Sequence, residues 1–192
     1  MRTGRLEAFS DGVLAILITI MVLELKVPHG ADWEALHHLF PVLCAYVLSF
    51  VYIGIYWNNH HHMLHACDRV TGGILWANLH LLFWLSLVPV ATDWMGEHHS
   101  QPLPSAVYGG ILLAAGVAYV ILQNAIIRSQ GEQSRLRALL GRDLKGKLSP
   151  VLYLLGIAAA FVHTALSQGI YAIVAAMWLI PDRRIEGRLA EN

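Results

Sequence analysis

The sequence predicts an all-α integral membrane protein, a single domain over residues 1–192 that crosses the bilayer six times. Its 192 residues are 56% hydrophobic and only 14% charged, and the mean hydropathy is +0.53. A bilayer-spanning helix needs about 20 predominantly apolar residues, and the chain offers six apolar runs near or approaching that length. A soluble bundle of unusually apolar helices is the alternative, and the length of most runs argues against it.

The six expected spans are separated by polar segments or by segments rich in Gly and Pro. The spans are residues 9–27, 36–57, 70–91, 105–127, 149–166 and 169–181, the last two being short. The breaks are residues 27–34, 58–69, 92–104, 128–148 and the Ser-Gln-Gly of 167–169. The first run is interpreted as a retained helix rather than a signal peptide, because acidic residues precede it and a small-residue cleavage site is not evident.

The distribution of positive charge predicts the orientation. Lys and Arg near the ends of spans are enriched on the cytoplasmic side, and 12 of the 13 basic residues fall on alternating connections or termini. These are Arg2, Arg5, Arg69, Arg128, Arg135, Arg137, Arg142, Lys145, Lys147, Arg183, Arg184 and Arg188. Lys26 is the exception, beside loops that carry Asp32, Glu34, Asp93 and Glu97. Both termini are therefore expected in the cytoplasm.

One face of the first span is a narrow apolar stripe. Successive helical residues are rotated by about 100°, so the residues that share a face with Ile16 follow from the sequence. Its members lie within about 60° of Ile16, and they are Gly12, Ile16, Thr19, Ile20 and Leu23. Ser10 and Asp11 lie roughly 120° and 140° away, on the far side of the helix. Asp11 and Ile16 are therefore expected to have different roles.

Asp11 invites two interpretations. An ionisable residue in a membrane segment usually faces protein or water and has a partner, which favours a buried network. Asp11 is also close to the cytoplasmic end of its span, where a carboxylate can cap the first turn or remain solvated. Arg5 is the nearest cation, and it could instead be an ordinary cytoplasmic anchor.

A cluster of histidines follows the second span. Trp57 and His61 share a face, and His60 flanks it, in a stretch that continues through His62, His65 and Cys67. A zinc site needs three or four converging ligands with supporting contacts, so this spacing indicates polar contacts between helices or a solvated helix end more strongly than a metal. We expect no bound metal here.

The third span carries polar residues that need partners. Trp76, His80 and Trp84 lie along one stripe, with Asn78 on another face. Asn and His in hydrocarbon require hydrogen bonds, and contacts with the second-span histidines and with Asp11 would supply them. The tryptophans taken singly are equally consistent with core or interfacial packing.

Several function classes are excluded by what the sequence lacks. Zero formal net charge argues against nucleic-acid binding. A nucleotide loop, an HExxH motif, a nucleophile elbow and a TVGYG-like filter are not found in the sequence. We therefore expect neither enzymatic activity nor a cofactor.

Three groups of residues resemble one known family. Arg5, Phe9, Ser10 and Asp11 match an RxxxFSD signature. Trp57, His60 and His61 match a WxxHH at the end of the second span, and Asn78, Pro89 and Thr92 match the third span of the same family. The sequence thereby resembles the short prokaryotic branch of the lysosomal potassium channel family, the transmembrane protein 175 family. The resemblance covers roughly the first half of the chain.

The resemblance implies a homotetramer of six-helix subunits in the prokaryotic cytoplasmic membrane, with the first helices around a central pore. It implies that Ile16, Thr19, Ile20 and Leu23 form the constriction and conduct potassium ions passively. It further implies a structural polar network, whose expected members are Arg5, Phe9, Ser10, Asp11, Trp57, His60, His61, Asn78 and Trp84. Packing or lipid contact remains the alternative role of the stripe.

Two other functions are consistent with the residues alone. A small proton-coupled secondary transporter would use Asp11 and the histidines to relay protons or bind substrate. A membrane protein that binds metal or haem would use the cluster from His60 to Cys67. A passive potassium current would distinguish the channel from both.

Overall fold

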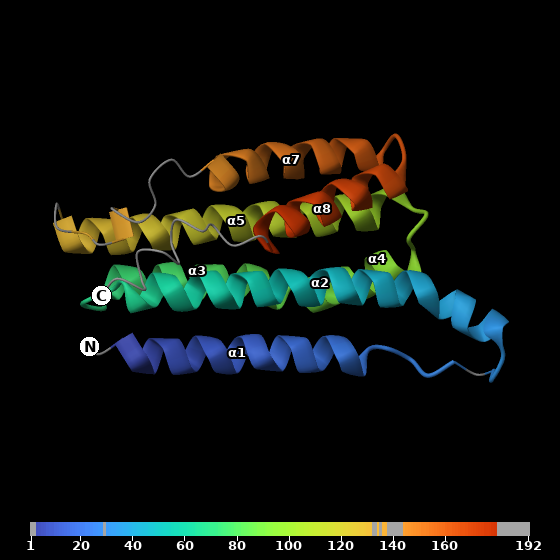
Figure 1. Ribbon diagram of the computed structural model, residues 1–192, viewed down its shortest axis with the longest axis horizontal. Helices are drawn as coiled ribbons and strands as arrows, with labels where there is room; N and C mark the ends of the chain where they lie inside the picture. Colours follow the sequence, from blue (N-terminus) through green and yellow to red (C-terminus); the bar gives the residue numbers. More distant parts are fainter. Residues whose placement is uncertain (1–2, 29, 132–133, 135, 138–143, 180–192) are drawn as a thin grey trace.

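The computed structural model describes residues 3–28, 30–131, 134, 136–137 and 144–179, and these form an all-helical bundle (Figure 1). Its principal helices are α1 (Thr3–Leu23), α2 (Trp33–His65), α3 (Gly72–Ser86), α4 (Val88–Glu97), α5 (Pro102–Gln130), α7 (Leu144–Ala160) and α8 (Thr164–Leu179). The prediction of an all-α chain is therefore correct.

Four stretches of the described residues are long and apolar enough to cross a membrane. They are α1, α2, α3 together with α4, and α5, each with a mean hydropathy of 1.7 to 2.0 over its best window. The helix α8 is apolar but only 16 residues long, and at about 1.5 Å per residue it spans roughly 24 Å. By length and composition, the described residues thus contain four candidate membrane spans.

The break between α3 and α4 has a local cause. Proline lacks a backbone N–H and its ring clashes with the carbonyl four residues earlier, and Pro89 stands in the first turn of α4. The helix α3 accordingly ends at Ser86, and α4 begins at Val88. The two pieces continue in one direction, so that they serve as a single span.

Several expected boundaries are wrong. The first span begins and ends earlier than 9–27, because polar residues before Phe9 continue the same helix, and α2 runs through the histidines to His65. The expected loop 92–104 is largely helical, since α4 extends to Glu97. Residues 167–169 lie inside α8, and the turn is at 161–163 instead. Polarity was misleading there because Ser167 is buried and Gln168 donates to the His99 carbonyl.

The helix ends gather as the charge pattern predicts. Figure 1 shows α1 beginning, α2 ending, α5 ending and α7 beginning at the same end of the bundle. The described basic residues at these ends are Arg5, Arg69, Arg128, Arg137, Lys145 and Lys147, whereas Lys26 is at the opposite end. Arg2, Arg135, Arg142, Arg183, Arg184, Arg188 and residues 180–181 of the last expected span lie outside the described residues.

The helices α5, α7 and α8 pack closely around one tyrosine. Tyr171 of α8 is fully buried, and its hydroxyl donates to the Ser105 carbonyl at 3.1 Å. A Cβ atom on Gly109 of α5 or Gly156 of α7 would overlap the Tyr171 ring. Glycine at both positions therefore lets the three helices approach, and Figure 1 places them on the side of the bundle away from α1.

Candidate functional site on the first helix

The helix α1 has one buried face. Its buried residues are Leu6, Ser10, Leu14, Leu17 and Met21, which recur every three or four positions as one helical stripe. The apolar members pack in the core with residues of α2, α3 and α5. This face fixes the rotation of α1 about its own axis, and so decides which residues face outward.

A chain of hydrogen bonds through the buried polar groups joins α1, α3 and α2. The Ser10 hydroxyl donates to the Leu6 carbonyl at 2.9 Å, and the Asn78 amide Nδ2 donates to Ser10 Oγ at 3.0 Å. The Asn78 Oδ1 then faces His60 Nε2 at 2.7 Å. All three side chains are almost completely buried. Because Oδ1 can only accept, the geometry assigns the Nε2–H proton to His60.

Two more pairs join α1 to α2 nearer the surface. The Trp57 indole Nε1 donates to Asp11 Oδ1 at 3.1 Å, and His61 Nδ1 lies 2.7 Å from Glu7 Oε1. His61 also stacks on the Trp57 ring. Asp11 is half-buried, so it is neither a member of the buried chain nor a fully solvated cap. The structure brings Ser10, Asp11, Trp57, His60, His61 and Asn78 into contacts that fasten α1.

Three expected members of this network lie elsewhere. Arg5 and Phe9 are exposed, because both fall within about 20° of Ile16 on the helical wheel and not on the buried face. The Trp84 indole donates to His80 Nε2 at 3.0 Å, one turn earlier on the same helix. Within the described part of one subunit, these three residues therefore do not join the network, and their place in it stays a prediction.

The opposite face of α1 has no partner among the described residues. Ile16 is 59% exposed, Ile20 is 40% exposed and Leu23 is 76% exposed, and Thr19 is also exposed. These residues form the stripe expected from the sequence, and Gly12 continues it. The Thr19 hydroxyl donates to the Ala15 carbonyl at 2.9 Å, and its oxygen keeps two lone pairs that can accept.

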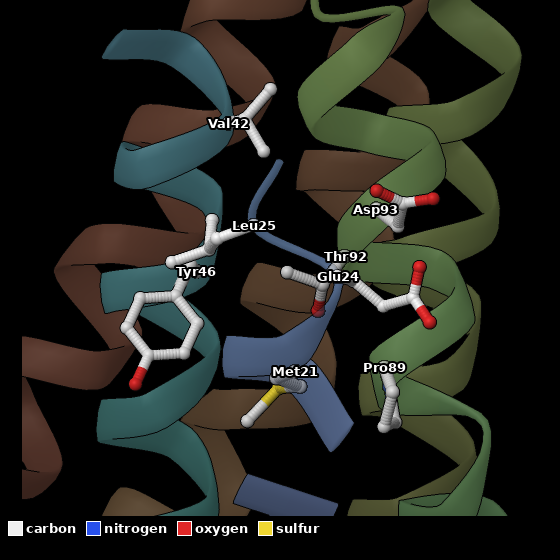
Figure 2. A pocket seen from close by; sticks show the side chains of 8 residues that line it. All are labelled: Met21, Glu24, Leu25, Val42, Tyr46, Pro89, Thr92 and Asp93. Carbon is white, nitrogen blue, oxygen red and sulfur yellow. The ribbon is translucent and has the colours of Figure 1, made fainter. Parts of the chain in front are cut away.

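The end of α1 opposite Arg5 is held by apolar packing and one surface ion pair. Figure 2 shows Met21 and Glu24 of this end beside Tyr46 of α2 and beside Pro89 and Asp93 of α4. Met21 is buried. Beyond the helix, Lys26 Nζ lies 2.7 Å from Glu97 Oε1. Contacts at both ends therefore hold α1 in one position.

The histidines of α2 do not converge on a single point. His61 stacks on His65, whereas His60 turns into the core towards Asn78. Among the residues that the structure describes, no group of three or more His, Cys, Asp or Glu side chains is arranged to hold a metal ion.

The contacts that fasten α1 form what we call the anchor, and its members are Glu7, Ser10, Asp11, Trp57, His60, His61 and Asn78. Sequence reasoning missed one member of the anchor and one buried cluster outside it. Glu7 was overlooked as a partner of His61, although it precedes Asp11 by four residues and therefore shares its side of the helix. A second buried cluster joins α2, α4 and α5, where the Ser49 hydroxyl lies 2.6 Å from that of Thr92 and 2.9 Å from that of Tyr108. Small hydroxyl residues in apolar runs gave too weak a pattern to identify this cluster.

Comparisons with known proteins agree with this geometry. The family described as endosomal/lysosomal potassium channel TMEM175 matches residues 5–89, the region that contains the whole anchor. A potassium channel of Chryseobacterium sp. (strain P1-3) is 55% identical over 192 residues, which is 100% of both chains. A potassium channel of Streptomyces collinus is 33% identical over 90% of this chain and 89% of its own.

A solved structure extends the likeness to the fold. The crystal structure of a lysosomal potassium-selective channel TMEM175 homolog from Chamaesiphon minutus superposes with a TM-score of 0.80 at 31% identity. The match covers 93% of this chain and 96% of the other. Full-length identity, the matched signature region and a shared fold lead to one conclusion: the chain belongs to the TMEM175 family.

Proposed function

We propose that this protein is a potassium-selective channel of the cell membrane and has no enzymatic activity. Four subunits surround a central pore, and α1 of each contributes Ile16, Thr19, Ile20 and Leu23 to its wall. The observation that carries the proposal is the exposed apolar stripe on a helix whose other face is fixed by buried contacts. Relatives of 55% and 33% identity are named potassium channels, and the superposed structure is titled a potassium-selective channel.

The stripe suggests how such a pore works. A ring of isoleucine side chains excludes water when narrow, so that it forms a hydrophobic gate. A potassium ion that passes must lose part of its hydration shell, and this loss costs less for potassium than for the smaller sodium ion. The lone pairs of the Thr19 hydroxyl would replace part of that shell. Selectivity then arises from the cost of dehydration and needs no carbonyl filter.

The finer topology is part of the proposal. Six spans and cytoplasmic termini are supported by the helix ends that gather with the basic residues at one end of the bundle (Figure 1). The helices α7 and α8 have 17 and 16 residues and would cross by packing against α5 rather than by their own length. Arg5 and Phe9 would then continue the stripe towards the cytoplasmic entrance of the pore.

A flux assay tests the proposal directly. Purified protein in liposomes is given a potassium gradient, with sodium as the competing cation. We expect passive potassium flux whose reversal potential follows the potassium gradient, and a mass in detergent of four times the subunit's 21.3 kDa. Flux that saturates and requires a proton gradient would instead indicate a secondary transporter, which would use the histidines and carboxylates of the anchor.

A further inference from the structure

A cavity separate from α1 lies between α2, α5, α7 and α8. It is an open groove, and its empty space of about 590 Å³ includes open solvent at the mouth. The residues around it belong to the halves of these helices nearest the basic end of the bundle. Figure 1 places α7 and α1 on opposite sides of the bundle, so the cavity is remote from the proposed pore.

The wall of the cavity is apolar and aromatic, with one unsatisfied amide. Tyr52, Tyr56, Tyr153 and Trp178 contribute rings, and the Trp178 indole is already satisfied by Ser149 Oγ at 2.9 Å. Gln123 also lines the cavity and is only 8% exposed. Its side-chain amide is open to the cavity, and no hydrogen bond joins it to the described residues. An occupant with a polar group on an apolar body would complement both this amide and the apolar wall.

The depth of Gln123 suggests which polar group. The 29 residues of α5 span about 43 Å, compared with a hydrocarbon thickness of about 30 Å. Gln123 precedes the end of α5 at Gln130 by seven residues, or about 10 Å. The amide therefore lies close to the boundary between hydrocarbon and headgroups, where the ester carbonyls of a phospholipid lie.

Two lysines flank the mouth of the cavity. Gly146, Ser149 and Tyr153 line it from one face of α7, and Lys145 and Lys147 lie immediately on either side of Gly146. Lys147 is exposed and Lys145 is half-buried. Basic residues between membrane helices at the cytoplasmic surface favour anionic lipid headgroups. The apolar wall, the Gln123 amide and the lysines at the mouth therefore follow one another in the same order as the acyl chain, the ester group and the phosphate of a phospholipid.

We propose that this cavity binds one anionic phospholipid of the cytoplasmic leaflet in each subunit. One acyl chain occupies the space between the tyrosines, the Gln123 amide donates to an ester carbonyl, and the phosphate lies near Lys145 and Lys147. The site is distinct from the pore, and its occupancy is measured without reference to ion flux.

Filling the cavity tests the proposal. A Cβ on Gly116 would make only ordinary contacts of 3.8 Å with Tyr153 and 3.9 Å with Tyr56, so Gly116→Leu places a side chain in the cavity without a clash. The control is Gly110→Leu on the same helix, where a Cβ meets nothing within 4 Å. Each protein is reconstituted with phosphatidylglycerol or phosphatidylcholine, repurified in mild detergent, and assayed for retained lipid by mass spectrometry.

We expect wild type and Gly110→Leu to retain about one phosphatidylglycerol per subunit, and Gly116→Leu to retain about tenfold less. Excluding two methylene groups is enough for that factor. Melting temperature and elution volume identify a variant that fails to fold. If Gly116→Leu fails to fold, Gln123→Leu is tested instead, because it removes the amide without filling the space. We expect Gln123→Leu to retain severalfold less phosphatidylglycerol than wild type. Equal retention by all variants, or phosphatidylcholine retained as well as phosphatidylglycerol, would overturn the proposal.

Discussion

The two faces of α1 differ in what determines their position. The buried face carries Ser10, which is tied to Asn78 and through it to His60 Nε2, so these three side chains are joined within one subunit. The open face carries Ile16 and Leu23, which have large exposed areas and no partner within the described part of the chain. One face is explained by the subunit alone, whereas the other requires an environment that the subunit does not supply.

This difference separates the residues that fix the helix from those that we propose line the pore. Polar groups in a membrane are stable only when they are paired, so Ser10 and Asp11 of the signature are used in structural contacts. The apolar residues of the open face remain available for the proposed pore. A charged residue near a membrane helix therefore does not by itself mark the ion pathway, and the two faces respond differently to substitution.

The largest expected effect is on the buried face. Asn78→Leu keeps a similar volume but removes the donor to Ser10, which keeps its bond to the Leu6 carbonyl, and the acceptor of His60 Nε2. The lost hydrogen bond costs about 1 kcal/mol, and the buried His60 group left unsatisfied costs about 1–3 kcal/mol. We expect a loss of about 2–4 kcal/mol per subunit, seen as a much lower melting temperature and poor yield. Asn58→Leu on α2 is the control, because Asn58 is exposed. Equal melting temperatures for the two variants would show that the chain of hydrogen bonds does not anchor α1.

The next effect is on the open face, where function should change and stability should not. Ile16→Asn replaces an apolar ring in the proposed constriction by amides that hydrate the pore. We expect potassium flux to rise about tenfold, a barrier change of about 1.4 kcal/mol, with weaker discrimination against sodium. Val22→Asn is the control, since Val22 is exposed on α1 but about 120° from Ile16. A similar rise for both variants would remove Ile16 from the constriction.

A smaller effect is expected at the border between the faces. Asp11→Ala removes the acceptor of one hydrogen bond, from the Trp57 indole at 3.1 Å, and a bond of this kind contributes about 1 kcal/mol. The melting temperature of the tetramer should fall modestly while the ratio of potassium to sodium flux stays constant. Trp57→Phe should have the same effect because it removes the other partner. An altered flux ratio at unchanged stability would place Asp11 in the ion pathway instead.

The sequence predicted the division between the two faces of α1 better than it predicted the individual contacts. The helical periodicity alone placed Ser10 and Ile16 on different faces of α1, because the angle between two residues of one helix depends only on their spacing in the sequence. The contact from Asn78 to Ser10 was expected in outline, since buried polar groups need partners. The exact membership of this polar network could not be predicted, because the positions of Arg5, Phe9 and Trp84 depend on how the helices pack.

The weakest predictions concerned the second half of the chain. The turn at 161–163 escaped notice because it interrupts an apolar stretch, whereas Ser167 and Gln168 resembled a loop. Both polar residues lie within α8, and Gln168 bonds to the loop before α5. Polarity in a membrane sequence indicates a loop or a buried contact equally well. Only the tertiary structure distinguishes the two.

The smallest expected effect concerns the ion pair beyond the end of α1 opposite Arg5. Lys26 and Glu97 are both exposed, and exposed pairs contribute little because water screens them. We expect Lys26→Gln to leave the melting temperature unchanged. Met21 is buried at the same end, so Met21→Ala should lower the free energy of unfolding by about 2–5 kcal/mol and the melting temperature with it. The hydrogen bond that Lys26 donates to Glu97 raises the pKa of Lys26 above its usual value of 10.5. The stability that depends on the charge of Lys26 is therefore present in full below pH 10.5 and is lost as the pH rises through that raised pKa. Melting curves across the neutral range should accordingly show no change that depends on Lys26, and a clear destabilisation by Lys26→Gln would show that charge, rather than apolar packing, holds this end of the helix.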